Sequence, residues 1–176
     1  METNKILLLG YMGSGKSTTG IELAQVLGYS FLDLDDVIKK REGKSIAELF
    51  EEHGELYFRA TERKCLEDIM NRSDSIVLSL GGGTPCYYDT MDYLLSLKKT
   101  KTFYLKASID TLCNRLFKEK ESRPLISHLN HIDDAKEFIG KHLFERNLFY
   151  QKAHHQVLID NKSVNQIVLE IKEKTN

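Results

Sequence analysis

The stretch Gly10-Tyr-Met-Gly-Ser-Gly-Lys-Ser17 is the most informative part of this chain, because it fits the phosphate-loop pattern G-x-x-x-x-G-K-[ST]. The apolar run Ile6 to Leu9 stands directly before it, and residues Thr18 to Leu27 continue with a helical pattern. In a strand, loop and helix of this order, the loop backbone and the helix N-terminus both direct N–H groups at phosphate oxygens. The sequence therefore predicts that this phosphate loop binds a nucleotide.

The individual positions of the loop have separate expected tasks. Lys16 should reach the β- and γ-phosphates, and the hydroxyl of Ser17 should bind Mg²⁺. The backbone around them should hold the phosphates, because its glycines let the chain curl around the oxygens. The predicted ATP-binding residues of this region are Gly13, Ser14, Gly15, Lys16, Ser17 and Thr18.

Length and composition exclude several classes of protein. A chain of 176 residues with 41% hydrophobic and 29% charged residues is typical of a single globular domain, here spanning 1–176. A net charge of −1 provides no field that would attract nucleic acid or an anionic membrane. The three cysteines form no C-x-x-C pair, and no apolar stretch approaches the length of a membrane span. We therefore expect a cytoplasmic protein with free thiols. We also expect a monomer that acts on a small-molecule substrate, although composition itself gives neither.

Short apolar runs alternate with longer helical patterns along the chain. This alternation predicts an α/β fold of three layers, with a five-stranded parallel sheet and helices on both faces. The five expected strands are Lys5–Leu9, Tyr29–Leu32, Ser75–Leu80, Lys101–Leu105 and Gln156–Ile159.

Two capping boxes mark helix starts. Ser45-x-x-Glu48 predicts a helix that runs to about Glu52, and Gly54 should separate it from a longer helix at 55–70. Ser163-x-x-Gln166 predicts the start of the final helix in the same way.

The segment at approximately 118–133 is polar, contains Pro124 and lacks a clean period. Loops of this length are usually functional or disordered. In a phosphotransferase, a mobile lid here would exclude water from the γ-phosphate, and Arg123 could then reach the phosphates. The alternative is an ordinary surface connection.

A pair of carboxylates stands at the end of the second expected strand. Alternation along an extended segment would direct Asp33 and Asp35 to one side, towards the sheet edge where ligands bind. One carboxylate could serve Mg²⁺ and the other an acceptor hydroxyl. Asp36 is expected to cap a helix that begins at Val37.

Two further features could serve a ligand. The run Gly81-Gly82-Gly83 follows the third strand at the same sheet edge and could offer N–H groups to a small ligand, although a flexible turn explains it equally well. Arg59 and Glu62 stand three apart on one helix face and could form a preorganised anion-binding arginine, but spacing alone favours an ordinary surface ion pair.

Taken together, these motifs resemble the shikimate kinases over essentially the whole chain. The resemblance rests on the phosphate loop, Asp33-Leu-Asp35, Gly54-x-x-x-Phe58-Arg59-x-x-Glu62, Leu80-Gly81-Gly82-Gly83, Arg123-Pro124-Leu125, and Arg146 followed by Tyr150. It implies an ATP-dependent kinase that phosphorylates the 3-hydroxyl of shikimate, in the pathway to chorismate and the aromatic amino acids. It also implies a fold like that of the nucleoside monophosphate kinases, with a lid and a substrate-binding region at approximately 33–62.

The resemblance also implies roles for residues on the acceptor side. Asp35 would hydrogen-bond the 3-hydroxyl and assist its deprotonation, and Asp33 would hold Mg²⁺ through water. Arg59 and Arg146 would bind the substrate carboxylate, with Glu62 fixing Arg59.

By the same resemblance, backbone groups of Gly81 and Gly82 would touch the ring hydroxyls. Arg123 would close over the phosphates with the lid, and Arg115 would lie against adenine. The residues implied to act in the transfer itself are Lys16, Asp35 and Arg123.

The chain departs from this family at one loop and leaves rival functions to test. The family often has a proline near the adenine after its last strand, whereas residues 159–162 contain none. Another small-molecule kinase of the same fold, such as a gluconate or nucleotide kinase, would also have the phosphate loop. A nucleotide-dependent switch without turnover is the rival from another class. A guanine-specific switch should carry N-K-x-D, and Asn161-Lys162-Ser163-Val164 lacks its aspartate.

Overall fold

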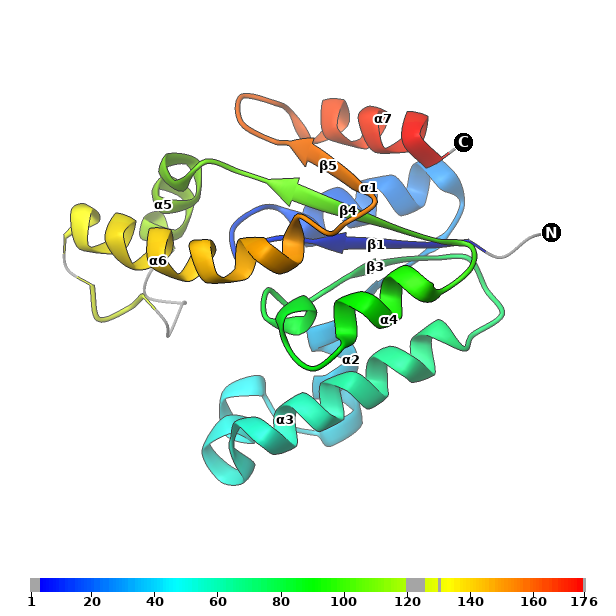
Figure 1. Cartoon of the computed structure of the whole chain (residues 1–176), viewed down its shortest axis with the longest axis horizontal. Helices are drawn as coiled ribbons and strands as arrows, with labels where there is room; N and C mark the ends of the chain where they lie inside the picture. Colours follow the sequence, from blue (N-terminus) through cyan, green and yellow to red (C-terminus); the bar gives the residue numbers. More distant parts are fainter. Residues whose placement is uncertain (1–3, 120–125, 130, 176) are drawn as a thin grey trace.

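The computed structural model of the chain describes residues 4–119, 126–129 and 131–175. Five parallel strands form one sheet in the order β2-β3-β1-β4-β5 (Figure 1). The expected α/β fold is thus confirmed, and every strand boundary lies within one residue of its expected position. The strands are β1 (Lys5–Leu9), β2 (Ser30–Asp33), β3 (Ile76–Ser79), β4 (Thr100–Lys106) and β5 (His155–Leu158).

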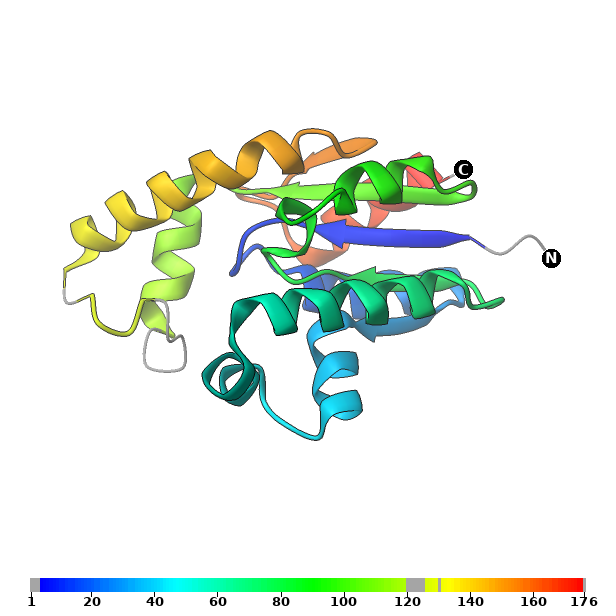
Figure 2. The same cartoon turned by 60° about the horizontal axis from the view of Figure 1, so that its bottom comes forward.

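Helices lie on both faces of this sheet. Helices α1 and α7 pack against each other over one face, while α4 and the second half of α3 cover the other (Figures 1 and 2). Helix α5 and the first half of α6 extend beyond the carboxyl ends of the strands. The helices are α1 (Lys16–Leu27), α2 (Leu34–Glu42), α3 (Ile46–Met70), the short 3₁₀ helix η1 (Thr84–Cys86), α4 (Thr90–Ser96), α5 (Ile109–Lys118), α6 (Ile132–Tyr150) and α7 (Val164–Thr175).

The central strand explains why the sheet needs cover on both faces. All five residues of β1 are buried, and the strand pairs with β3 on one side and β4 on the other. A parallel strand in this position has apolar side chains on both faces, so it reads as a continuous apolar run rather than an alternating one. The run that precedes the phosphate loop therefore anchors that loop to the central strand of the sheet.

Both predicted capping boxes are present. Ser45 Oγ accepts from the Glu48 N–H, and the Ser45 N–H donates to the Glu48 carboxylate at 2.7 Å. Ser163 and Gln166 make the same reciprocal pair. The two helices expected around Gly54 join as α3 with a kink, because Gly54 adopts φ 77° and ψ 175° in its middle.

The start of α2 differs from the sequence prediction. The helix begins at Leu34 rather than Val37, and its cap is Asp33, whose carboxylate accepts from the Asp35 N–H at 3.1 Å. The extended backbone of Asp33 (φ −107°, ψ 127°) lets its side chain cover the free N–H groups of the first turn. Asp36 instead pairs with Lys39. The predicted strand alternation of Asp33 and Asp35 is therefore wrong, because Asp35 already belongs to the helix.

Residues 120–125 and 130 of the expected lid lie outside the described residues. The expectation for Arg123 is therefore not tested. Within the described part, α5 ends at Lys118, Ile126 is buried at 1% exposure, and α6 begins at Ile132. No helix of the described residues has the length and apolar character needed to cross a membrane.

Two helical glycines provide a matched test of the packing. A methyl group on Gly20 in α1 would lie 2.4 Å from Cε2 of Phe31, whereas one on Gly140 in α6 would meet only Ile109 Cδ1 at 3.5 Å. We expect Gly20→Ala to lower the free energy of unfolding by about 1–2 kcal/mol through overpacking. Gly140→Ala should raise it by up to about 1 kcal/mol, because alanine favours the helix.

Urea unfolding of the two variants and the wild-type protein measures both changes. Equal effects of the two substitutions would contradict the close packing of α1 against β2.

Candidate active site

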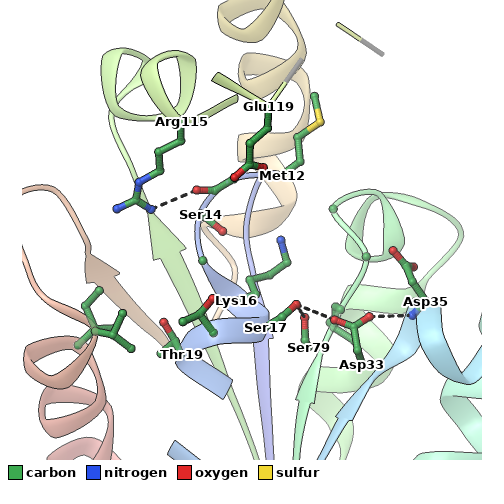
Figure 3. A pocket seen from close by; sticks show the side chains of 18 of the residues that line it. Met12, Ser14, Lys16, Ser17, Thr19, Asp33, Asp35, Ser79, Arg115 and Glu119 are labelled. Atoms are coloured by element: carbon green, nitrogen blue, oxygen red, sulfur yellow. Dashed lines mark hydrogen bonds between the residues drawn. The ribbon is translucent and has the colours of Figure 1, made fainter. Parts of the chain in front are cut away.

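A cavity of about 590 Å³ opens at the carboxyl ends of the strands (Figure 3). Parallel strands bring residues from distant parts of the chain to this one edge, which is why ligands bind there in open α/β sheets. The lining residues are Met12 to Thr19, Asp33, Asp35, Ser79 to Gly82, Arg115, Lys118, Glu119, Lys162, Val164 and Ile167. All the residues predicted from the phosphate-loop motif, Gly13 to Thr18, are among them.

The phosphate loop wraps around its own lysine. Lys16 Nζ donates to the carbonyl oxygens of Gly10 and Tyr11 at 2.9 and 3.1 Å. Gly13 and Gly15 have φ values of 79° and 84°, a left-handed conformation that glycine adopts without strain. The loop thus presents backbone N–H groups and one ammonium group to the same space, which suits a polyphosphate.

A hydroxyl and a carboxylate meet beside the loop. Ser17 Oγ donates to Asp33 Oδ2 at 2.7 Å and lies 3.5 Å from Ser79 Oγ (Figure 3). Mg²⁺ prefers such hard oxygen ligands and usually keeps several waters, so this pair fits the ion. Ser79 was not among the predicted site residues, although its place at the end of β3, two residues before the glycine run, was a usable indication.

Asp35 faces the cavity from the first turn of α2 (Figure 3). Burial, followed by the negative charges of Asp33 and Glu62, raises the pKa of its carboxyl group to about 6. Lys16 and Lys39 counteract this shift. A carboxylate that titrates near neutrality can hold a proton passed from an acceptor hydroxyl.

Glu62 connects α3 to the glycine run through both of its oxygens. Oε2 accepts from Arg59 Nη1 at 2.9 Å, and Oε1 accepts from Thr84 Oγ1 at 2.6 Å. The side chains of Arg59 and Glu62 are 10% and 4% exposed, so this is a buried pair. The ordinary surface ion pair that spacing alone favoured is therefore wrong, because both side chains are buried. Sequence spacing gave no indication of Thr84.

The Arg59 guanidinium is held tightly between aromatic rings and backbone. Its Cζ lies 3.8 Å from the centre of the Tyr87 ring, and a methyl group on Gly83 would lie 2.7 Å from Nη2. Burial acts to lower the pKa of Arg59, but the charge and hydrogen bond of Glu62, together with Tyr87, outweigh burial and raise that pKa. The guanidinium is thus a fixed cation beside the glycine run.

Arg146 approaches the same run from α6. A methyl group on Gly82 would lie 3.2 Å from Arg146 Nη1, and the Arg146 guanidinium lies 5.6 Å from the centre of the Tyr11 ring. Asp35 also approaches it, since a methyl group on Gly81 would lie 3.1 Å from Asp35 Oδ1. The fold therefore brings Asp35, Arg59 and Arg146 to three successive glycines, where a side chain would press on these groups or on Thr84.

The opposite side of the cavity contains Arg115. Its Nη1 donates to the Gly13 carbonyl at 3.1 Å (Figure 3). Three further lining residues, Lys162, Val164 and Ile167, come from the loop after β5 and from α7, and sequence reasoning had not selected them. Asp160 fixes this loop by accepting from the Ser108 N–H and Oγ–H at 3.0–3.1 Å. The loop that lacks the family proline is thus held by an aspartate.

Comparison with known proteins gives one consistent result. The family model for shikimate kinase matches residues 12–176. A shikimate kinase of Flavobacterium johnsoniae is 47% identical over 167 residues, covering 95% of this chain and 96% of that relative. The crystal structure of shikimate kinase from Bacteroides thetaiotaomicron is similar with a TM-score of 0.88 and 35% identity, covering 97% of each chain. The shikimate kinase of Acinetobacter baumannii, solved in complex with shikimate, gives 0.85 and 28%, covering 98% of this chain and 92% of its own.

The raised pKa of Asp35 predicts a pH-dependent cost in stability. The folded protein binds this proton more tightly than the unfolded chain, so stability falls as the pH rises from about 4 to about 6 and stays lower above that range. Asp35→Asn should therefore raise the free energy of unfolding by about 2 kcal/mol at about pH 8, and by much less at about pH 4.

Chemical unfolding at the two pH values measures this difference. Asp36→Asn is the matched control, because that side chain is 71% exposed. An equal gain for Asp35→Asn at both pH values would contradict the buried, like-charged environment of Asp35.

Proposed function

Because this chain belongs to the shikimate kinase family, we propose that its cavity binds ATP on the phosphate-loop side and shikimate on the side of the glycine run. The chain is an ATP-dependent kinase of shikimate. The residue assignment rests mainly on one geometric fact. One carboxylate and two arginines approach three successive glycines, and these residues are Asp35, Arg59 and Arg146. This site would receive an acceptor that has both a hydroxyl and a carboxylate.

ATP is proposed to bind with its phosphates in the phosphate loop. The N–H groups of Gly13 to Thr18 would hold the phosphate oxygens, and Lys16 would leave the carbonyls of Gly10 and Tyr11 for the β- and γ-phosphates. This exchange costs the lysine two hydrogen bonds to neutral acceptors and gains it stronger contacts with charged ones.

Ser17 and Asp33 are proposed to hold Mg²⁺, directly and through water respectively. Their mutual hydrogen bond at 2.7 Å supports this assignment, because it holds the two oxygens next to each other beside the phosphate loop. When bound, Mg²⁺ neutralises the charge of the phosphates during transfer.

Asp35 is proposed to orient the 3-hydroxyl of shikimate towards the γ-phosphate and to take its proton. The loose transition state of phosphoryl transfer demands little base assistance, so positioning is the larger part of this role. The γ-phosphoryl group then passes to the hydroxyl oxygen, giving shikimate 3-phosphate and ADP. The environment of Asp35 supports the role, because a carboxyl group with a pKa of about 6 can be ionised before transfer and accept the proton during it.

The substrate carboxylate is proposed to lie between Arg59 and Arg146, with backbone groups of Gly81 and Gly82 at the ring hydroxyls. A guanidinium presents a planar fork of N–H groups that matches a carboxylate. The buried bond to Glu62 supports the role of Arg59, since it fixes one edge of the guanidinium and leaves another for the ligand.

Two arginines are proposed to act on the nucleotide. Arg115 would lie against adenine, which is supported by its place on the cavity wall opposite Asp35. Arg123 would close over the phosphates as part of a lid at approximately 118–133, and this proposal rests on the sequence motif alone.

We also propose that the protein acts as a cytoplasmic monomer that binds neither membranes nor nucleic acid. One chain supplies the phosphate loop, both carboxylates and both arginines of the site. The free state of Cys65, Cys86 and Cys113 supports a reducing compartment.

Replacement of Arg59 by lysine tests the acceptor site. Arg59→Lys should raise the KM for shikimate at least about tenfold while the KM for ATP stays within about twofold, because an ammonium cannot reproduce the fork or the bond to Glu62. The measurement is coupled detection of ADP release at varied shikimate.

Arg63→Lys is the matched control on the same helix. Arg63 pairs with Glu67 and Asp89, so its substitution should leave both KM values close to those of the wild-type protein. Equal KM values for shikimate in the wild type and Arg59→Lys would remove Arg59 from the acceptor site.

A further inference from the structure

A buried tyrosine connects the end of α6 to the glycine run. Tyr150 is the last residue of α6, has 0% exposure, and donates its hydroxyl proton to the Gly82 carbonyl oxygen at 2.5 Å. Burial raises the pKa of this phenol above its ordinary value, so the hydroxyl keeps its proton at neutral pH. The bond joins residues that are 68 positions apart in the sequence.

The other two carbonyls of the run have local partners. Gly81 O accepts from the Thr84 N–H at 3.1 Å, and Gly83 O accepts from the Cys86 N–H at 2.8 Å, both within the turn that forms η1. For the middle carbonyl, Tyr150 supplies the hydrogen bond. Because a peptide unit is planar, holding the Gly82 carbonyl also fixes the direction of the Gly83 N–H. Glycine has no side chain to restrict rotation of that unit, so the tyrosine supplies the restriction.

The same hydroxyl lies next to Arg146. Arg146 stands one helical turn before Tyr150 on the same face of α6 and influences the pKa of the phenol by its charge and by a side-chain hydrogen bond. A hydroxyl can donate one hydrogen bond and accept two. Tyr150 Oη can therefore accept from the Arg146 guanidinium while it donates to Gly82.

We propose that Tyr150 is a positioning residue of the acceptor site, whose hydroxyl fixes the spacing between the Arg146 guanidinium and the Gly82 peptide. This inference rests on the proposed role of Arg146 in binding the substrate carboxylate. Arg146 then binds the carboxylate and the glycine run contacts the ring, and the tyrosine holds these two contacts at a constant distance. Tyr150 itself contacts neither shikimate nor ATP.

The variant Tyr150→Phe removes the hydroxyl between Arg146 and Gly82 with the least change in packing. Its ring still fills the space beside Tyr104, whose ring centre lies 5.1 Å away. We expect the KM for shikimate to rise about tenfold, a factor typical of losing a hydrogen bond to a charged group. The kcat and the KM for ATP should stay within about twofold, because the phosphate loop is untouched.

Tyr104→Phe is the matched control for the loss of a buried hydroxyl. Tyr104 is 2% exposed, burial raises its pKa to about 12, and its ring packs against that of Tyr150. This variant reports the effect of the change on stability alone, and its KM for shikimate should match that of the wild type. An equal rise in KM for both tyrosine variants would overturn the positioning role.

A double-mutant cycle with Arg146→Gln distinguishes a positioning role of Tyr150 from a non-specific effect on the structure of the site. If Tyr150 acts through Arg146, adding Tyr150→Phe to Arg146→Gln should lower kcat/KM for shikimate by less than about threefold, compared with about tenfold in the wild-type background. Full multiplication of the two effects would overturn the inference while leaving the role of Arg146 intact. If Arg146→Gln alone leaves the KM for shikimate unchanged, the proposed function of Arg146 fails, and the inference fails with it.

Discussion

The buried carboxylate of Glu62 is the contact on which the acceptor side of the site depends. One oxygen holds Arg59 and the other holds Thr84, so a single side chain fixes the guanidinium of α3 against the turn that follows the glycine run. Removing one partner of such a pair would leave an uncompensated buried charge, which is costly. Burial and the charge of Asp33 raise the pKa of Asp35 first, and the negative charge of Glu62 adds to them. Glu62 thus contributes both to the orientation of the arginine and to the environment of the aspartate.

Three carboxylates lie close together at the edge of the sheet, and their different neighbours suit them to different roles. Asp33 is held by Ser17 and by the first turn of α2, Glu62 is held by Arg59, and Asp35 is left to face the cavity. The consequence is a site whose ionised form costs stability, because Asp35 is buried beside two other negative charges. Such opposition between stability and activity is common where chemistry requires a destabilised group.

Local features of the site could be predicted from the sequence, whereas contacts between distant elements could not. The phosphate loop, both capping boxes and the Arg59–Glu62 pair follow from spacing within one element, and the structure contains all of them. The helix start at Leu34 was missed because Asp33 and Asp36 are equally good caps by residue type, and only the end of β2 decides between them. Thr84 and the bond from Tyr150 to Gly82 depend on how η1, α3 and α6 pack, and no local pattern encodes that packing.

Asp35 can orient the acceptor hydroxyl as a hydrogen-bond acceptor and take its proton only when its carboxyl group is ionised. The most direct measurement is the pH dependence of kcat/KM for shikimate at saturating magnesium–ATP, between about pH 5 and about pH 8. We expect a plateau at high pH and a fall towards acid with a midpoint near the Asp35 pKa of about 6. A profile that stays flat to about pH 5 would contradict it, because the protonated carboxyl group could not then accept the proton.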